Sequence, residues 1–469
     1  MTSRQAKIGL AGLLALALAL RIAAWSFKGG FHYPDEIFQQ LEPAHILRTG
    51  QGWLPWEFGR GLRSWVMPWF YAGLLETLSW VGIQGHDALR AVNLHNALWS
   101  ACMVPALWRM GRAMEIRGGQ EGEPAGFLAA LLMACWPTAL YFAPHALMDS
   151  PSMIFLTWGY AFWLEERVEG APTARRAALW MGLFFGLAGV VRFTSGLHML
   201  VPLADLALRR RWKALGWLTV GAAPGLLLLG AVDWLTWGRP FHSAIEHFTY
   251  NYLEGGASDH GVSPWHFYLT ESFGARLGPG IVVVAGLLIL ALPRAWPALL
   301  TVAVPTLLLS TVAHKEERFL MHNWPLLMGA LAVGLAALWR RASRRSRGLA
   351  AGLTAAMIAL MLTSNLHGTS KLPWRWRAGI FEAQRFVGHQ PDASGLLLDD
   401  RQHLNGGQLA LDRAIPQVQS RPSWWGNPLF NYAALRGDDP QTARLLERGW
   451  TQVATFEDIR VLRRPPSSR

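Results

Sequence analysis

Long apolar runs recur along residues 8–366 and are separated by short polar segments. A membrane-spanning helix needs about 20 predominantly apolar residues, so each run is a candidate span. The pattern predicts about eleven spans, or ten if the two runs around Gly196 form one broken helix. The candidates are 8–27, 91–108, 124–143, 149–164, 177–193, 195–208, 214–236, 277–292, 298–313, 322–339 and 349–366.

Arginine-rich segments assign the two sides of the membrane, because cytoplasmic loops carry an excess of Lys and Arg. With the N-terminus inside, the inner loops contain "RMGRAMEIRGG", "EERVEGAPTARR", "RRRWK", "PRAW" and "RRASRRSR". The first run lacks a small-residue cleavage site after it, so we expect a retained anchor rather than a signal peptide. The outer segments are then 28–90, 144–150, a turn near 194, 237–276, 314–321 and everything after 367.

Two outer segments have a character of their own. Residues 68–83 are apolar but short and include Glu76, which favours a helix lying along the outer interface. The residues after 367 are polar, with turn signals such as "NGG" and strand-like runs "GLLLDD" and "TFEDIRVLRR". We therefore predict a membrane body over 1–366 and a small mixed α/β extracytoplasmic domain over 367–469.

Composition supports a polytopic helical membrane protein. The chain is 52% hydrophobic and 16% charged, whereas soluble domains are about 25% charged. The net charge of +12 fits cytoplasmic loops and not nucleic-acid binding. Cys102 and Cys135 lie in apolar runs, so neither a disulfide nor a metal site is expected. Glycine loops of the nucleotide-binding type and His/Cys clusters with metal-ligand spacing are missing from the sequence, so no cofactor is expected to be required. A divalent cation stays open as an alternative, although no motif indicates one.

Ionisable residues gather on the outer side. Charged residues at membrane depth are costly and usually functional, and here Arg21, Arg192 and Asp233 fall at outer ends of predicted spans. This distribution predicts a titratable cluster at the level of the lipid headgroups. The outer segments add Asp35, Glu36, Glu42, Arg63, Asp149, Lys315, Glu316, Glu317 and Arg318, with His32, His45, His145, His266 and His314.

Each of these features also has a purely structural interpretation. Asp35 and Glu36 follow Pro34 and could stabilise the first turn of a helix. Arg21 and Arg192 could be interfacial anchors. The segment "HKEER" could be a solvated loop between two spans. All of these residues converge on one face, however, and this convergence favours a functional site.

The chemistry that suits such a face is group transfer from a lipid phosphate. A carboxylate near the lipid interface is partly desolvated and more basic, so it could accept a proton from a sugar hydroxyl. Arg63, Arg192, Lys315 and Arg318 could hold a phosphate leaving group through charge-assisted hydrogen bonds. Aromatic residues, which are abundant in these segments, pack on sugar rings and prenyl chains.

Four stretches resemble motifs of one family. "HYPDEIFQQLEPAH" is similar to H-P-D-E-x-x-Q-x-x-E-x-x-H, and "GWLPWEFGRGLRSWVMP" to G-x-x-T-W-E-x-x-x-x-x-x-R-S-x-x-x-P. The segment from "VDWLTWG" to "PWHFYLT" is similar to one that runs from D-x-x-x-x-G to a P-W-H-W-Y box, and "HKEERFLMHNWP" to H-K-E-x-R-F-x-x-P-x-x-P. In this order they resemble the Alg9-like mannosyltransferases, multispan glycosyltransferases of the GT-C class.

This resemblance implies roles for the matching residues. Asp35 would be the catalytic base or its close support, with Glu36 beside it. The other matches are Trp56, Glu57, Arg63 and Ser64, then Pro264, Trp265, His266 and Tyr268, and then His314, Lys315, Glu316, Arg318 and Phe319. The implied reaction is inverting and uses dolichyl-phosphate-mannose. We assign substrate binding to Glu57, Arg63, Arg192, Trp265, His266, His314, Lys315, Glu316 and Arg318, of which Arg192 rests on topology alone.

The chain also departs from the family pattern. Tyr33 lengthens the first motif, and Glu317 and His322 stand where an aromatic residue and a proline are common. Leu54-Pro55 replaces the usual L-T before W-E, and "PHALMDSPSM" lacks the usual polar signature. "PDE…Q..LE..H" and "LRS…P" look most like the branch that adds the third mannose of the GPI anchor. The Gly/Ala/Arg/Trp-rich composition favours a prokaryotic chain, in which case the donor would carry a bacterial polyprenyl group.

The sequence therefore predicts a mannosyltransferase that moves mannose from a lipid phosphate to a glycan or glycolipid hydroxyl at the outer face. That face would be the exterior of a bacterial plasma membrane, or the lumen if the protein is eukaryotic. A transporter would need polar residues at mid-membrane and an internal repeat. A non-catalytic scaffold would explain the fold but not the retained acidic site. A GT-C enzyme with another donor sugar, such as arabinose or glucose, stays open.

Overall fold

The computed structural model describes residues 3–116, 122–168, 174–399 and 405–465. The chain folds into two compact units. The first, here the helical unit, comprises residues 1–25, 96–144 and 148–372. The second, here the mixed unit, comprises residues 26–95, 145–147 and 373–469. The segment predicted as the first outer loop thus folds with the C-terminal residues, and the predicted boundary after 366 falls within a helix that ends at Ser370.

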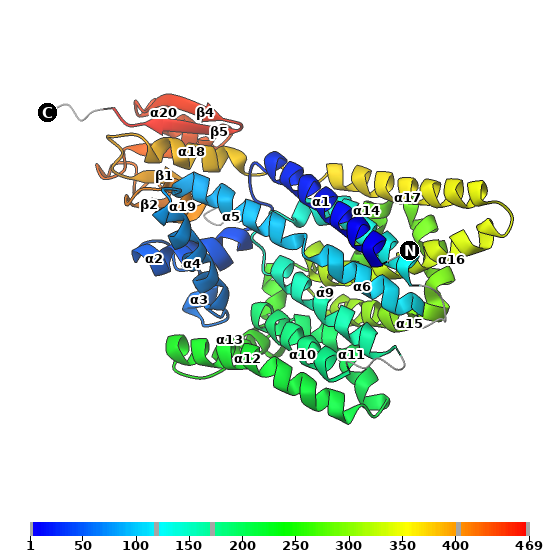
Figure 1. Ribbon diagram of the computed structural model, residues 1–469. Helices are drawn as coiled ribbons and strands as arrows, with labels where there is room; N and C mark the ends of the chain where they lie inside the picture. Colours follow the sequence, from blue (N-terminus) through cyan, green and yellow to red (C-terminus); the bar gives the residue numbers. More distant parts are fainter. Residues whose placement is uncertain (1–2, 117–121, 169–173, 400–404, 466–469) are drawn as a thin grey trace. The chain divides into compact units, whose positions relative to one another are not determined.

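The helical unit consists of helices of very different length (Figure 1). In order they are α1 (Ser3–Phe27), α6 (Met103–Ile116), α7 (Glu123–Cys135), α8 (Pro137–Phe142), α9 (Asp149–Glu166), α10 (Ala174–Val191), α11 (Ser195–Leu208), α12 (Trp212–Trp237), α13 (His242–Phe248), η2 (Thr249–Leu253), η3 (Gly256–His260), η4 (Tyr268–Gly274), α14 (Ala275–Leu277), α15 (Gly280–Thr311), η5 (Glu317–Asn323), α16 (Trp324–Ser343) and α17 (Arg347–Ser370).

Five helices in the described part of the chain are long and apolar enough to cross a membrane. They are Gln5–Phe27, Trp212–Trp237, Gly280–Thr311, Glu317–Ser343 and Arg347–Ser370. The protein is therefore a helical membrane protein, but the predicted count of about eleven spans is not confirmed. The inner loops predicted around 109–119 and 165–176 lie partly outside the described residues.

Several predicted spans are divided differently in the structure. The run 91–108 breaks between α5 (Gly85–Ser100) and α6, and the run 124–143 breaks at Trp136 between α7 and α8. Arg21 of α1 is fully buried and donates to the carbonyls of Met133 and Ala134 at the end of α7. Its side chain thereby satisfies backbone acceptors that the helix end leaves open. The two runs around Gly196 form separate helices, α10 and α11.

The predicted spans 277–292 and 298–313 are joined in one helix, α15, which has Pro293 and Pro297 where a loop was expected. Ile281 lines a cavity with Trp324, and the Thr306 hydroxyl accepts a hydrogen bond from Asn323 at 3.0 Å. In a straight helix, residues 281 and 306 would lie about 38 Å apart. Helix α15 must therefore bend back between them, and proline is the usual cause of such a bend.

Glycine allows α10 and α12 to pack closely side by side (Figure 1). A Cβ atom at Gly182 would lie 2.0 Å from the carbonyl oxygen of Leu218, and one at Gly221 would lie 2.1 Å from that of Leu179. Small residues at helix contacts are typical of membrane helices, because dispersion contacts replace the hydrophobic effect there.

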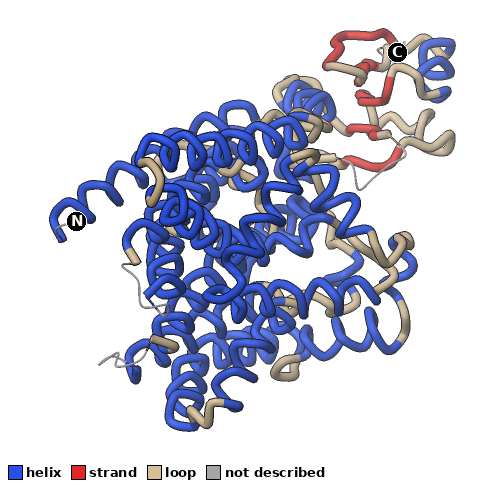
Figure 2. Tube along the Cα trace, turned by 90° about the vertical axis from the view of Figure 1, so that its right-hand side faces the viewer, coloured by secondary structure: helices blue, strands red, loops and turns tan. Residues whose placement is uncertain are grey.

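The mixed unit combines helices with a five-stranded sheet, drawn red in Figure 2. Its strands have the order β2-β1-β3-β5-β4, with β1 parallel to β2 and β3, and β5 antiparallel to β3 and β4. The strand-like runs at 395–400 and 455–464 are confirmed by β1 and by β4 and β5. The strands are β1 (Leu396–Leu398), β2 (Gln417–Gln419), β3 (Tyr432–Arg436), β4 (Thr451–Phe456) and β5 (Ile459–Arg463).

The helices of this unit come from both ends of the chain. They are η1 (Ile37–Leu41), α2 (Glu42–Thr49), α3 (Trp56–Gly59), α4 (Val66–Trp80) and the start of α5, followed by α18 (Ala378–Gly388), α19 (Gly407–Leu411) and α20 (Pro440–Glu447). The run 68–83 is thus helical as predicted, in α4. A core of Leu397, Trp425, Phe430, Leu435 and Leu462 packs on the sheet.

Candidate active site

One continuous helical run carries the two predicted catalytic carboxylates. Asp35 and Glu36 form its first turn, the π-helical turn η1 follows, and α2 completes it at Thr49. A π-turn inserts one extra residue, and such turns are frequent at functional sites. The side chain of Glu36 is buried, whereas Asp35 is half-buried. The two neighbouring acids therefore lie in different environments.

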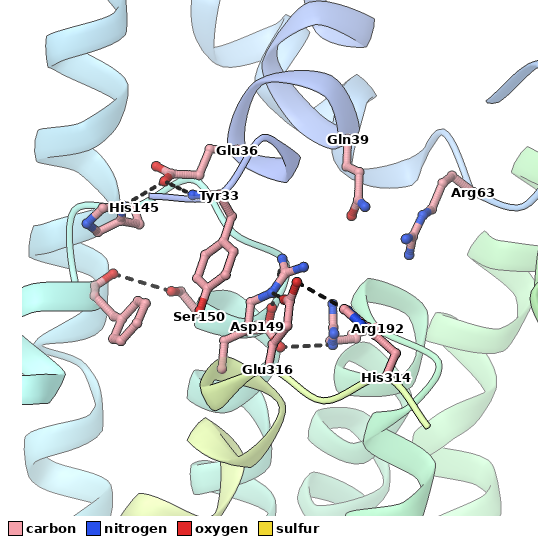
Figure 3. Close-up of polar contacts among 12 residues, drawn as sticks. Tyr33, Glu36, Gln39, Arg63, His145, Asp149, Ser150, Arg192, His314 and Glu316 are labelled. Atoms are coloured by element: carbon pink, nitrogen blue, oxygen red, sulfur yellow. Dashed lines mark hydrogen bonds and ion pairs between the residues drawn. The ribbon is translucent and has the colours of Figure 1, made fainter. Parts of the chain in front are cut away.

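Glu36 is held from several sides. Its Oε1 accepts a hydrogen bond from His145 Nδ1 at 2.8 Å (Figure 3). The same oxygen accepts a hydrogen bond from the backbone N–H of His32 at 2.7 Å. The ammonium of Lys28 lies 3.4 Å from Oε2. Burial alone would raise the pKa of the Glu36 carboxyl, but the charges and hydrogen bonds of His145 and Lys28 hold it well below its usual range. Glu36 is therefore a fixed anion whose geometry suits an anchor better than a proton acceptor.

The motif residues Glu57 and Arg63 form an ion pair in the same unit. Arg63 donates to Glu57 Oε1 through Nη2 at 2.6 Å and through Nε at 3.1 Å. Gln39 of η1 donates to the same oxygen at 3.2 Å, so the helical run is connected to this pair. The carboxylate of Glu57 thus orients Arg63, and the structure brings these two predicted substrate-binding residues together.

In the helical unit, a fully buried aspartate holds two arginines. Asp149, the first residue of α9, lies 2.9 Å from Arg192 Nε through Oδ1 and 3.8 Å from Arg318 Nη1 through Oδ2. Both guanidinium groups also stand near the ring of Phe319, at 5.3 and 5.5 Å from its centroid. Two like charges can remain close in a buried place because the carboxylate compensates them.

The "HKEER" stretch extends this cluster. Glu316 pairs with Arg318 and, at 3.3 Å, with His314 Nε2. Figure 3 shows His314 and Glu316 beside Arg192 and Asp149. Burial opposes ionisation of Glu316, but Arg318 and His314 prevail and lower its pKa to about 2. The hydrogen bond to Glu316 raises the pKa of His314. These contacts form a continuous row of paired side chains, here called the charged chain, which consists of Asp149, Arg318, Glu316 and His314.

The structure does not bring every predicted residue into this chain. Lys315 is buried and donates to the carbonyls of Ser263 and Val312 at 2.9 and 2.5 Å. Its side chain thus binds the residue before the P-W-H box to the end of α15. Trp265 and His266 are exposed and contact one another edge to face. Tyr268 of the same box is fully buried instead.

An apolar cavity of about 320 Å³ lies on the other side of the same stretch. Its lining comes mainly from α15, α16 and η4, and includes Ala285, Leu288 and Leu331. Its polar end is an ion pair in which Arg276 Nε and Nη2 each donate to Glu317 at 2.7 Å. Consecutive residues of the motif therefore face different features. Glu316 and Arg318 belong to the charged chain, whereas Glu317 lines the cavity.

Sequence reasoning missed part of these arrangements. Asp149 and His145 were recognised as outer ionisable residues but not assigned to the site, and the roles of Lys28 and Gln39 were not foreseen. Asp149 lies in the stretch that departs from the family pattern, so no motif identified it. The described residues contain no group of three His, Cys, Asp or Glu side chains that could hold a metal ion.

Known proteins share the fold of this chain. ArnT from Cupriavidus metallidurans, bound to undecaprenyl phosphate, superposes with a TM-score of 0.64 at 14% identity, over 97% of this chain and 98% of that one. An Archaeoglobus fulgidus oligosaccharyltransferase gives a TM-score of 0.58 at 12% identity, over 93% and 69%. The helical body with a small C-terminal sheet is thus a fold of the GT-C type.

The sequence comparisons are more specific. A GPI mannosyltransferase 3 of Yarrowia lipolytica is 27% identical over 333 residues, 68% of this chain and 61% of its own length. A GPI alpha-1,2-mannosyltransferase 3 of Mus musculus is 27% identical over 355 residues, 72% and 62%. The chain thus spans about three fifths of the length of these relatives. Residues 13–373 match the Alg9-like mannosyltransferase family, and the chain belongs to that family.

Proposed function

We propose that the protein is an inverting mannosyltransferase that uses polyprenyl- or dolichyl-phosphate-mannose. The acceptor is a hydroxyl of a glycan or glycolipid, and the reaction takes place at the extracytoplasmic face. Family membership and relatives named GPI mannosyltransferases support this assignment. Because the chain spans only part of those relatives, the GPI precursor is one acceptor to test among other glycolipids.

The observation that carries the proposal is the pair of arginines on one buried carboxylate. Arg192 and Arg318 both contact Asp149, with the aromatic ring of Phe319 beside them. A guanidinium has five N–H donors in a planar fork, so it can serve a carboxylate and a phosphate at once. We assign these arginines to the phosphate of the donor, where they stabilise the charge that develops as the lipid phosphate leaves.

Asp35 is the proposed base. Its carboxylate takes the proton of the acceptor hydroxyl as that oxygen forms a bond to the anomeric carbon. The bond from this carbon to the phosphate oxygen breaks, and its electron pair leaves with the lipid phosphate. The attack from the opposite face inverts the anomeric configuration. Glu36, bound to His145 and Lys28, holds the start of the helical run and takes no proton.

The lipid chain of the donor fits the apolar cavity. Side chains such as Ala285, Leu288 and Leu331 line it, and Glu317 at its polar end is the neighbour of Glu316 and Arg318. In the membrane an isoprenoid chain gains dispersion contacts with these side chains, because the hydrophobic effect does not drive its transfer from the lipid tails. The proposal keeps about eleven crossings and an extracytoplasmic site, with the two arms of the bent helix α15 counted as two of these crossings.

The test is transfer of radiolabelled mannose from polyprenyl-phosphate-mannose to a membrane lipid extract by the purified protein. We expect labelled product from the wild type and at least about a hundredfold less from Asp35→Asn. Asp259→Asn, at an exposed position, is the matched control. Equal labelling by Asp35→Asn would remove Asp35 from the reaction. Consumption of a glucose or arabinose lipid phosphate in place of the mannose donor would refute the proposed donor sugar.

A further inference from the structure

Glu42 has a completely buried carboxylate with an unusual set of partners. Its Oε1 accepts a hydrogen bond from the backbone N–H of Trp53 at 2.8 Å. Its Oε2 accepts from the backbone N–H groups of Gln408 at 2.8 Å and Leu409 at 3.4 Å. All four residues belong to the mixed unit, and the carboxylate joins segments that lie more than 360 residues apart in the sequence, as the separations of 366 and 367 show.

Two glycines make room for this carboxylate. Gly52 has φ +140° and Gly407 has φ +68°, conformations that side chains rarely adopt. A Cβ atom at Gly52 would lie 2.8 Å from Oε1 of Glu42, and one at Gly407 would lie 2.2 Å from Oε2. The two backbone segments can approach the carboxylate because both positions are glycine.

The C-terminal partner is itself fixed. The side chain of Gln408 donates to the carbonyls of Arg413 and Ile415 and accepts from Gln417 at 3.1 Å. Gln417 in turn accepts from Gln384 at 2.9 Å. Buried amide networks of this kind are rigid when every member has a partner. The N–H groups that hold Glu42 therefore belong to a rigid part of the sheet region.

Glu42 lies on the same helical run as Asp35. Its contacts fix one end of that run, while Glu36 is fixed by Lys28 and His145, and Gln39 contacts Glu57. A continuous helical segment transmits a displacement at one point to the others. A base must be placed to within a fraction of an ångström, and a 1 Å error can reduce the rate about a hundredfold.

We propose that Glu42 is a positioning residue, through which the C-terminal sheet region holds the catalytic run in place. This inference rests on the proposed function, since it gives Asp35 a task. It also assigns a role to residues 405–412, which the sequence alone did not reveal. Loss of the contact should reduce kcat and leave donor binding unchanged, because Glu42 acts on the position of the base.

The test compares two variants that break the contact from opposite sides. Glu42→Gln keeps the shape but places an amide N–H against a backbone donor, and Gly407→Ala leaves Glu42 intact but occupies its place. Gly50→Ala is the matched control, because its φ of +70° imposes the same strain while nothing lies within 4 Å of the added Cβ. Measurements are kcat and KM for the lipid donor, normalised to correctly folded protein, and hydrogen exchange of residues 35–49.

We expect kcat of Glu42→Gln and Gly407→Ala to fall about tenfold to a hundredfold. KM should stay within about twofold, and Gly50→Ala should match the wild type. Exchange of residues 35–49 should accelerate only in the first two variants. Full kcat in both, or an equal loss in Gly50→Ala, would overturn the proposal. If the wild type transfers no sugar, the proposed function fails. The positioning role of Glu42 is then judged by hydrogen exchange alone, and unchanged exchange of residues 35–49 in both variants overturns it.

Discussion

Asp149 and Arg192 form a buried ion pair in which Oδ1 and Nε are 2.9 Å apart, although one residue begins α9 and the other follows α10. The same carboxylate contacts Arg318 through its second oxygen. Asp149 therefore links the segment after α10 to the "HKEER" stretch. Loss of the Asp149 charge would leave both arginines without this partner, and this gives a direct prediction.

Asp149→Asn should destabilise the protein strongly. Removing one partner of a buried ion pair costs about 3–5 kcal/mol, because the remaining charges are left uncompensated. We expect a lower midpoint of thermal unfolding in detergent and loss of binding of the donor lipid. Asp259→Asn, in an exposed position, should behave as wild type. An unchanged midpoint for Asp149→Asn would show that Asp149 does not hold the arginines.

The His314–Glu316 pair should make stability depend on pH. The hydrogen bond to Glu316 raises the pKa of His314 above 6.5. Its charged form therefore stabilises the folded state fully below pH 6.5, and this contribution is lost as the pH rises through the raised value. The unfolding midpoint should fall more between about pH 6 and about pH 9 in wild type than in His314→Asn. The exposed His367→Asn is the control, and parallel curves for wild type and His314→Asn would contradict the prediction.

The amide variants Asp35→Asn and Glu36→Gln should have different effects on stability and on activity. Glu36→Gln removes the anion from Lys28 and His145, both buried with it, and should lower the free energy of unfolding by about 3 kcal/mol. Asp35→Asn should leave the unfolding midpoint close to wild type while abolishing transfer. Chemical denaturation and transfer assays on both variants separate the two roles. A stable but inactive Glu36→Gln would reverse the assignment.

Filling the apolar cavity should select against long donors. Ala285→Trp places a large ring in the cavity, and the steric cost of seating a chain beside it, about 1–3 kcal/mol, should weaken binding about tenfold. KM should rise for a long-chain polyprenyl-phosphate-mannose and not for a short-chain analogue. Ala355→Trp, at an exposed position of α17, provides the comparison. Equal effects on both donors would place the lipid chain elsewhere.

The amino-acid pattern alone determined the helical membrane character, the mixed C-terminal region and the residues that carry the family's motifs. These properties are local, because apolar run length, strand alternation and motif spacing are written in consecutive residues. The pattern also placed Glu57 and Arg63 in one short motif, although it did not predict their ion pair. The pattern predicted a loop around the prolines between the spans 277–292 and 298–313. In the structure the helix α15 continues through these prolines and bends.

Tertiary structure decided which of the ionisable residues act together. Asp149 meets Arg192 and Arg318, and Glu42 meets Gln408, only because segments far apart in the chain are brought together. It also gave Asp35 and Glu36, which are neighbours in the sequence, different burial and different partners. The reason is physical: the charge state and mobility of a carboxylate depend on its burial and its partners, and both are properties of the folded chain.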